Sequence, residues 1–301
     1  MSTVTEEPQV MRRVRNRLTS RWATVAAVLI AAVWTIPTFG LFVSSFRPAA
    51  MQQGPRSNGW WNAFTDWQFT FKNYADVLSS ASSQSPNLGQ YFLNSLAIVI
   101  PATIFPLVLA AMAAYMFCWG KFKGKDTLFI LVFALQIVPL QMALIPLLQL
   151  FTQVLKLPGG SYLQLWIAHT IFALPLATFL LHNFISEIPG EVIEAARVDG
   201  AGHATIFFRV ILPLSVPALA SFGIFQFLWV WNDLLVALVF SGGTSDVAPI
   251  TQRLAELSGT RGNKDYLLPA AAFTSIIVPL LVFFGLQRYF VRGLLAGGLK
   301  G

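Results

Sequence analysis

The stretch SEIPGEVIEAARVDGAGHATIFFRVILP, residues 186–213, is a polar island between two long apolar segments. Its charged side chains are Glu187, Glu191, Glu194, Arg197, Asp199 and Arg209. Ionised groups are costly in a bilayer, so this island must face water or a protein partner while the flanking segments lie in the membrane. The chain is therefore organised around one polar connection between two membrane segments.

The first half of the island is predicted to form a short helix over residues 190–198. Pro189 suits a first helical position, and the glycine of the Asp199–Gly200 pair can take the left-handed conformation that ends a helix. A helix this short is marginal in water and needs a surface to dock against. Four apolar residues are expected on one side of it, namely Val192, Ile193, Ala195 and Ala196.

Composition places the chain among integral membrane proteins. Of its 301 residues, 55% are hydrophobic and only 11% are charged, whereas soluble domains carry about 25% charged residues. Its mean hydropathy is +0.64. The apolar run that begins at Trp22 is about 25 residues long, which is too long for a secretory signal and long enough to span the hydrocarbon core. We therefore expect an all-α integral membrane protein.

Six apolar segments predict six transmembrane helices. A polar tail occupies residues 1–21 and a membrane domain residues 22–301, with a polar connection at 186–213 and loops at 47–90 and 241–265 on the opposite side. The spans are expected at about 22–46, 91–119, 127–155, 163–185, 214–240 and 266–287. Each contains proline, which favours flexible helices around a path.

The distribution of basic residues predicts the orientation. With six spans, 13 of the 20 Lys and Arg residues fall on the side of both termini and of the polar island, and 7 fall on the other side. By the positive-inside rule, both termini and the island are cytoplasmic. On the outer side, residues 60–71 are rich in Trp and Phe, which suits either a membrane interface or contact with a partner.

Few polar side chains within the spans suggest chemistry. His169 and His182 have no carboxylate nearby in sequence, so hydrogen-bonded packing is favoured over a proton relay. Asp233 is the only carboxylate inside a span, where a central position would cost about 2.5–3.5 kcal/mol on insertion scales. It is therefore expected to face the protein interior, a water-filled path or the outer interface.

Several functions are not supported by the sequence. The turn GKFKGKD, residues 120–126, fails as a phosphate loop because its glycines are too close and Asp126 replaces the required Ser or Thr. No metal-spaced His and Glu cluster and no nucleophile–base pair is visible, and the single Cys118 forms no intramolecular disulfide. No basic patch interleaved with aromatic residues indicates nucleic acid. We predict a non-catalytic chain that binds no metal or cofactor.

The polar island also resembles a known motif. Glu194-Ala195-Ala196 is followed after three residues by Gly200 and after nine more by VILP at 210–213, a spacing similar to the EAA loop of ABC importer permeases. The family has Ile where this chain has Val210. The segment FTFKNYADVL at 69–78, Asn232–Asp233 and the tail QRYFVRGLLAGGLKG at 287–301 resemble the maltose-type carbohydrate permease that lacks the large outer domain. The resemblance covers nearly the whole chain.

This resemblance implies the type I importer permease fold and a set of partners. Those partners are a second permease, two cytoplasmic ATPase subunits that bind ATP and Mg²⁺, and an extracytoplasmic sugar-binding protein touching residues 241–265. The ATPase-coupling residues would be Glu194, Ala195, Ala196, Asp199, Gly200, Gly297 and Gly298. In the maltose system the sugar sites lie mainly on the partner permease, so for the candidate path residues Trp229, Asn232 and Asp233 simple helix packing is favoured over contact with the sugar. The implied substrate is maltose, maltodextrin, trehalose or another α-glucoside.

Alternatives differ in energy source and substrate. A related importer could serve a polyol, glycerol phosphate or an amino acid, although the segment 69–78 and the tail favour sugars. A proton-coupled secondary carrier would need paired intramembrane carboxylate and His groups, and in the sequence Asp233 stands alone. A membrane-embedded enzyme would need a catalytic cluster that the sequence does not contain.

Overall fold

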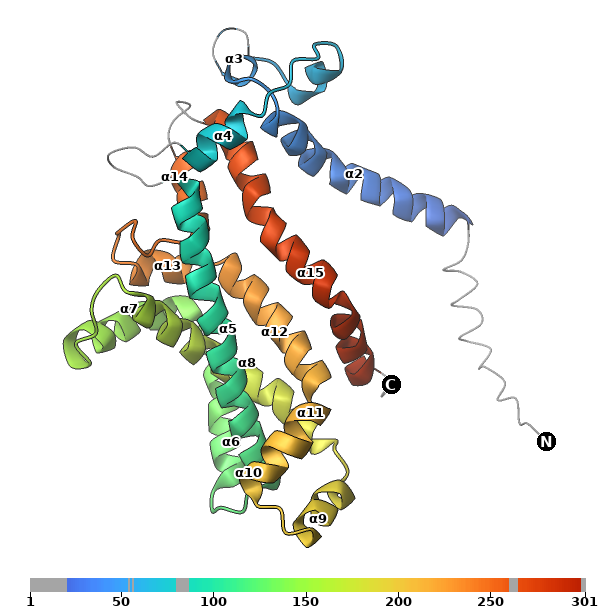
Figure 1. Ribbon diagram of the computed structural model, residues 1–301, viewed down its shortest axis with the longest axis vertical. Coiled ribbons are helices and arrows are strands. Elements are labelled where there is room, and N and C mark those ends of the chain that lie inside the picture. The colour runs from blue at the N-terminus through green and yellow to red at the C-terminus, as the bar shows by residue number, and fades with distance from the viewer. Residues whose placement is uncertain (1–20, 54, 56, 80–86, 260–264, 299–301) are drawn as a thin grey trace.

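The computed structural model describes residues 21–53, 55, 57–79, 87–259 and 265–298. Every regular element within those residues is a helix. Figure 1 shows an elongated bundle in which α5 (Leu88–Trp119) packs along α8 (Tyr162–Ser186), α12 (Val216–Trp231) contacts both, and α15 (Leu268–Gly298) contacts α12. The predicted N-terminal tail lies outside the described residues.

Four helices are long and apolar enough to cross a membrane, and two bent helix pairs bring the number to as many as six within the described residues. The four are α2 (Arg21–Ser45), α5, α8 and the segment Asp265–Gln287, which includes the short helix η5 (Asp265–Leu267) and the first part of α15. By length and composition these elements match the six spans expected from the sequence, but two of the six are broken.

The expected third span, 127–155, is two helical segments that meet at an angle of 104°. The first consists of α6 (Lys125–Ala134) and η2 (Leu135–Ile137), and the second of α7 (Leu140–Gln149) and the π-helix η3 (Leu150–Val154). Val138 is extended, with ψ of 118°, and precedes Pro139. A residue before proline is sterically kept out of the helical region, which explains the break.

The expected fifth span, 214–240, is also interrupted. The helical segment at 203–214 comprises α10 (His203–Ile206), the π-helix η4 (Phe207–Ile211) and α11 (Leu212–Leu214), and it meets α12 at 72°. After α12 ends at Trp231, three non-helical residues precede α13 (Leu235–Phe240). Most of the expected fifth span is therefore two helical pieces, α12 and α13, which are separated at residues 232–234, where Asp233 precedes the new helix. The segment 203–214, which bends against α12, falls in the expected polar connection 186–213.

Two clusters of buried apolar side chains hold the bundle together. One joins α5, α8, α12 and α13 to α14 (Ile250–Ser258) in the loop after α13. The other joins the opposite ends of α5 and α8 to α9 (Gly190–Val198), α10 and η4. The second cluster anchors the polar island to the membrane helices.

The helix α2 stands apart from this bundle. Only 6% of its most apolar window is buried, and in Figure 1 it diverges from α15 toward the N-terminus. The C-terminal half of α2 contacts η1 (Trp60–Phe64), and the connection that follows α2 also contains α3 (Ala49–Gln52) and α4 (Lys72–Ser79). Most of α2 therefore presents an apolar surface that the rest of the described residues leave uncovered.

The segment after α2 is folded around a buried cation. Arg47 donates to the main-chain carbonyl of Asn58 at 3.0 Å and to the side-chain oxygen of Asn58. Asn73 donates to the carbonyls of Ser45 and Arg47 at 3.0 and 2.8 Å. Burial lowers the pKa of Arg47, an effect that the charge of Asp66 opposes. These bonds leave Trp61, Phe64, Trp67 and Phe71 exposed on the surface, where a membrane interface or a partner could cover them.

Candidate functional site

The polar island forms a defined helix with a glycine end. The helix α9 covers Gly190–Val198, with Pro189 at the position just before it. The amide of Gly200 donates to the Arg197 carbonyl at 3.0 Å, and the amide of Ala201 donates to the Ala196 carbonyl at 2.9 Å. This pair of bonds is the Schellman motif. Gly200 has φ of +80°, so the predicted left-handed stop is present.

Ile193 is the buried side chain through which α9 packs on the rest of the protein, with the half-buried Ala196 against the same cluster. Ile193 is fully buried and lies in the cluster that contains Leu181 and Ile185 of α8 and Ile206 and Ile211 of the following segment. The four apolar residues expected on one side of α9 therefore differ in burial. Ala196 is half-buried, whereas Val192 and Ala195 are exposed. Part of the apolar side of α9 therefore packs against this chain itself, on α8 and the segment that follows α9.

The outer face of α9 is accessible. Glu194 and Ala195 are exposed, and Val198 at the end of the helix has 87% of its surface exposed. Glu191 in the first turn and Arg197 in the last turn each complement the helix dipole. A helix anchored by a single buried isoleucine thus presents small, apolar and acidic side chains outward at one end of the molecule (Figure 1).

The return from α9 to the membrane is tied to α5. The Tyr115 hydroxyl lies 2.9 Å from His203 Nδ1, and the Tyr115 ring packs against Phe207 with centroids 5.5 Å apart. Sequence reasoning missed this contact because Tyr115 and His203 are 88 positions apart. Movement of α9 can therefore reach α5 as well as α8.

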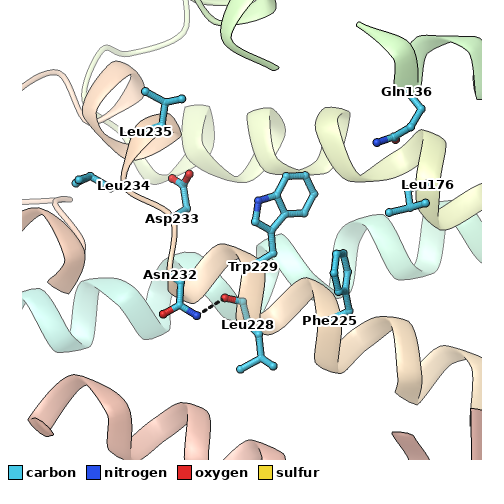
Figure 2. A pocket seen from close by; sticks show the side chains of 9 residues that line it. All are labelled: Gln136, Leu176, Phe225, Leu228, Trp229, Asn232, Asp233, Leu234 and Leu235. Carbon is cyan, nitrogen blue, oxygen red and sulfur yellow. Dashed lines mark hydrogen bonds between the residues drawn. The ribbon is translucent and has the colours of Figure 1, made fainter. Parts of the chain in front are cut away.

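A second polar site lies where the two broken spans face each other. A cavity of about 720 Å³ is lined by side chains from four elements. The lining residues are Gln136, Leu176, Phe225, Leu228, Trp229, Asn232, Asp233, Leu234 and Leu235 (Figure 2). The three path residues expected from the sequence are all among them. Gln136 and Leu176 were not singled out, because only the fold brings η2 and α8 next to α12. Phe225 was also missed, although its position one helical turn before Trp229 carried a local signal.

The carboxylate of Asp233 has a structural role at this cavity. It accepts hydrogen bonds from the amides of Val236 at 3.3 Å and Ala237 at 3.0 Å, which would otherwise be unpaired at the start of α13. The Thr251 hydroxyl donates to the Asp233 carbonyl at 2.5 Å. Asp233 therefore ends one helical piece and starts the next.

The structure corrects the expectation that His169 lacks a carboxylate neighbour and that Asp233 stands alone. His169 Nε2 of α8 lies 3.8 Å from Asp233 Oδ2, and the two side chains are 5% and 10% exposed. This distance is too long for a hydrogen bond but short enough for an ion pair when the imidazole is protonated. The sequence could not reveal the pair, since 64 positions separate the two residues.

The segment after α13 is fixed to α5 by buried hydrogen bonds. Asn94 of α5 donates to the carbonyls of Ser245 and Ala248 at 3.2 and 3.0 Å, and Ser95 Oγ accepts from the Ile250 amide at 2.8 Å. Part of the expected partner-binding segment 241–265 is thus held in place. At the other end of the chain, Gly297 and Gly298 lie in the last turn of α15.

Comparison with known proteins identifies the family. Residues 106–295 match the family described as the binding-protein-dependent transport system inner membrane component. An osmoprotective compounds uptake permease protein from Synechocystis sp. is 53% identical over 295 residues, covering 95% of each chain. An alpha-glucoside transport system permease protein from Rhizobium meliloti is 51% identical over 263 residues, covering 85% of this chain and 68% of the relative.

A solved structure supports the fold. A chain of a bacterial ABC transporter involved in the import of the acidic polysaccharide alginate matches with a TM-score of 0.63 and 15% identity, covering 92% of this chain and 98% of that chain. The alternatives of a secondary carrier, a membrane enzyme and an importer of polyols or amino acids are not favoured by these matches. The chain belongs to the family of binding-protein-dependent transport system inner membrane components and is a sugar ABC importer permease.

Proposed function

We propose that this chain is the permease subunit of an ATP-driven importer of α-glucosides and that α9 transmits the movement of a cytoplasmic ATPase to the membrane helices. The named substrates of relatives support the sugar class, since one is an alpha-glucoside permease and another a trehalose/maltose permease from Thermococcus litoralis. ATP and Mg²⁺ belong to separate ATPase subunits, and this chain forms half of the path together with a second permease.

The observation that carries the coupling role is the form of α9. It is short, capped at Gly200, anchored by Ile193 and exposed along Glu194, Ala195 and Val198. Small side chains allow a partner to approach closely, and the exposed acidic group can set its register. Force on this face passes through Ile193 into α8 and through the segment 203–214 into α12. The two helices that flank the island would then move together.

The remaining partners follow from orientation. The excess of basic residues on the side of α9 supports a cytoplasmic position for the island and for both termini. The anchored segment 241–259 would then face outward, where an extracytoplasmic binding protein could deliver sugar. Gly297 and Gly298 at the end of α15 would then lie on the cytoplasmic side, as a second proposed ATPase contact.

Copurification tests this proposal. The chain is expressed with its partner permease and ATPase and extracted in mild detergent, and the amount of ATPase that elutes with it is measured. We expect Glu194→Lys and Ala195→Trp to reduce the retained ATPase strongly, because both alter the exposed face of α9. Phe208→Ala serves as a control, since Phe208 is also exposed but lies in η4. Equal retention in all variants would contradict the coupling role.

The His169–Asp233 pair gives one observation in favour of a proton-coupled carrier. The two mechanisms differ in their energy source. In vesicles containing the complete importer, we expect sugar uptake to require ATP and to persist when the proton gradient is collapsed at constant ATP. Uptake that needs the gradient and proceeds without ATP would support the carrier instead.

A further inference from the structure

We infer that the cavity at the two helix breaks is a contact site on this subunit for an uncharged glycoside and that Asp233 selects against anionic sugars. This inference rests on the proposed function, because it assumes that sugar passes along this chain. It adds the residues that touch the sugar and the charge class that they accept. Trp229, Asn232 and Asp233 form its centre, with Phe225 and Gln136 beside them.

The position of the cavity favours a substrate site. Its polar wall is the non-helical stretch 232–234, and its opposite wall includes η2, next to the 104° bend of the third span. Leu176, close to the middle of α8, also lines it. Irregular backbone within a membrane is tolerated where it is buried in protein or lines a water-filled space, and broken helices form the binding sites of many transporters.

The lining suits the surfaces of a sugar ring. Phe225 and Trp229 lie 6.3 Å apart between ring centroids and provide aromatic faces for the apolar side of a pyranose. Figure 2 shows Trp229 between Phe225 and the polar groups at Asn232 and Asp233. A volume of about 720 Å³ lies within the range of roughly 300–1,000 Å³ for small-molecule sites.

Asp233 and Asn232 supply hydrogen-bond acceptors to the cavity. A carboxylate offers about four acceptor positions, and the two amides of α13 use two of those on Asp233. The Asn232 amide nitrogen donates to the Leu228 carbonyl at 2.8 Å, which leaves the Asn232 side-chain oxygen available as an acceptor. Hydroxyl groups of a sugar can donate to these oxygens.

Charge decides which sugars fit. Asp233 is the one ionisable residue among those that line the cavity, and the lining contains no Lys or Arg. A uronate or a phosphorylated sugar would bring a second negative charge close to Asp233, and like charges at short range repel. The site therefore accepts neutral glycosides, even though a structural neighbour with the same fold belongs to an importer of an acidic polysaccharide.

Cysteine protection tests the ligand class without the binding protein. In a Cys118→Ala background, Asn232→Cys places a thiol on the cavity wall of the complete permease–ATPase complex. Its rate of reaction with a small neutral thiol reagent is measured with trehalose, with maltose or with a glucuronic acid disaccharide of similar size. Thr244→Cys, exposed in the outer segment, is the control.

We expect the neutral disaccharides to slow labelling of Asn232→Cys several-fold and the anionic one to leave it unchanged. Adding Asp233→Asn, which keeps one acceptor oxygen for α13, should allow the anionic sugar to protect as well. If no sugar protects Asn232→Cys, or if the anionic sugar protects equally while Asp233 is present, the inference is wrong.

Transport by the reconstituted importer separates this inference from the proposed function. At a fixed concentration of sugar-loaded binding protein, we expect Trp229→Ala and Asp233→Asn to lower the sugar imported per ATP by about ten-fold. Phe227→Ala is the matched control, because Phe227 stacks on Trp231 and does not line the cavity. Wild-type ratios in both cavity variants would overturn the inference, whereas wild-type uptake that does not depend on ATP would overturn the proposed function.

Discussion

At the residue scale, the proposed coupling between α9 and the ATPase depends on the backbone conformation of Gly200, which ends α9. Its φ of +80° lies in the left-handed region, while a Cβ built there would meet no atom within 4 Å. A substitution is therefore opposed by the backbone alone and not by a clash. That distinction allows the conformational effect to be separated from the size of the side chain.

Replacing Gly200 by Ala is expected to weaken the end of α9 by about 1–2 kcal/mol, the usual cost of the left-handed conformation for a residue with a Cβ. Gly200→Asn should be milder although Asn is larger, because Asn tolerates this conformation. The readout is sugar imported per ATP in reconstituted vesicles. We predict a lower ratio for Ala than for Asn, and the reverse order would show that side-chain size matters instead.

Residue-scale prediction from sequence succeeded where the signal was local. The Asp199–Gly200 stop is a property of adjacent residues, so it could be predicted directly. The approach of His169 to Asp233 could not, because it depends on how α8 packs against the start of α13. Gln136 was missed for the same reason, because it lies in η2 and joins the cavity only through helix packing. Trp229 was a candidate path residue because it lies close to Asn232 and Asp233 in the sequence.

At the scale of elements, the proposed transmission of movement requires α9 to stay packed on α8 and the segment 203–214. Ile193→Ala removes the one fully buried side chain of α9, and truncating a buried Ile to Ala costs about 2–5 kcal/mol. We expect faster hydrogen exchange of the α9 amides and less sugar imported per ATP. Val192→Ala, at a neighbouring position that is 39% exposed, is the control. Slow exchange in Ile193→Ala would mean that α9 is held by other contacts.

The two broken spans show what hydropathy alone can and cannot predict. Both 127–155 and 214–240 are continuous apolar segments, so a hydropathy argument joins each into one helix. Pro139 did carry a local signal for the first break. The interruption between α12 and α13 is stabilised by Asp233, which accepts from the amides of α13, and such residues inside an apolar segment are easily taken for buried polar residues.

For the whole molecule, the sequence predicted an all-α membrane protein and the number of candidate spans, because both follow from hydropathy and charge. The relative placement of the spans required the structure. The exposed length of α2 belongs to this scale too, since its apolar surface needs lipid or the second permease to cover it.

Orientation is a testable property of the whole molecule. In a Cys118→Ala background, Val198→Cys and Gln68→Cys place exposed thiols on α9 and on the segment after α2. A membrane-impermeant reagent added to intact cells should label Gln68→Cys and leave Val198→Cys unlabelled until the membrane is opened. The opposite pattern would place both termini and α9 outside and would make contact with a cytoplasmic ATPase impossible.

Site-specific photocrosslinking from α9 tests the central claim most directly. A photoreactive amino acid is introduced at Val198, and, as a control, at Phe208 on the return segment, in the assembled importer in native membranes. The account predicts that the Val198 position crosslinks to the ATPase subunit and that the Phe208 position does so much less. Crosslinks from Val198 only to lipid or to this chain itself, with the ATPase present and active, would contradict a coupling role for α9.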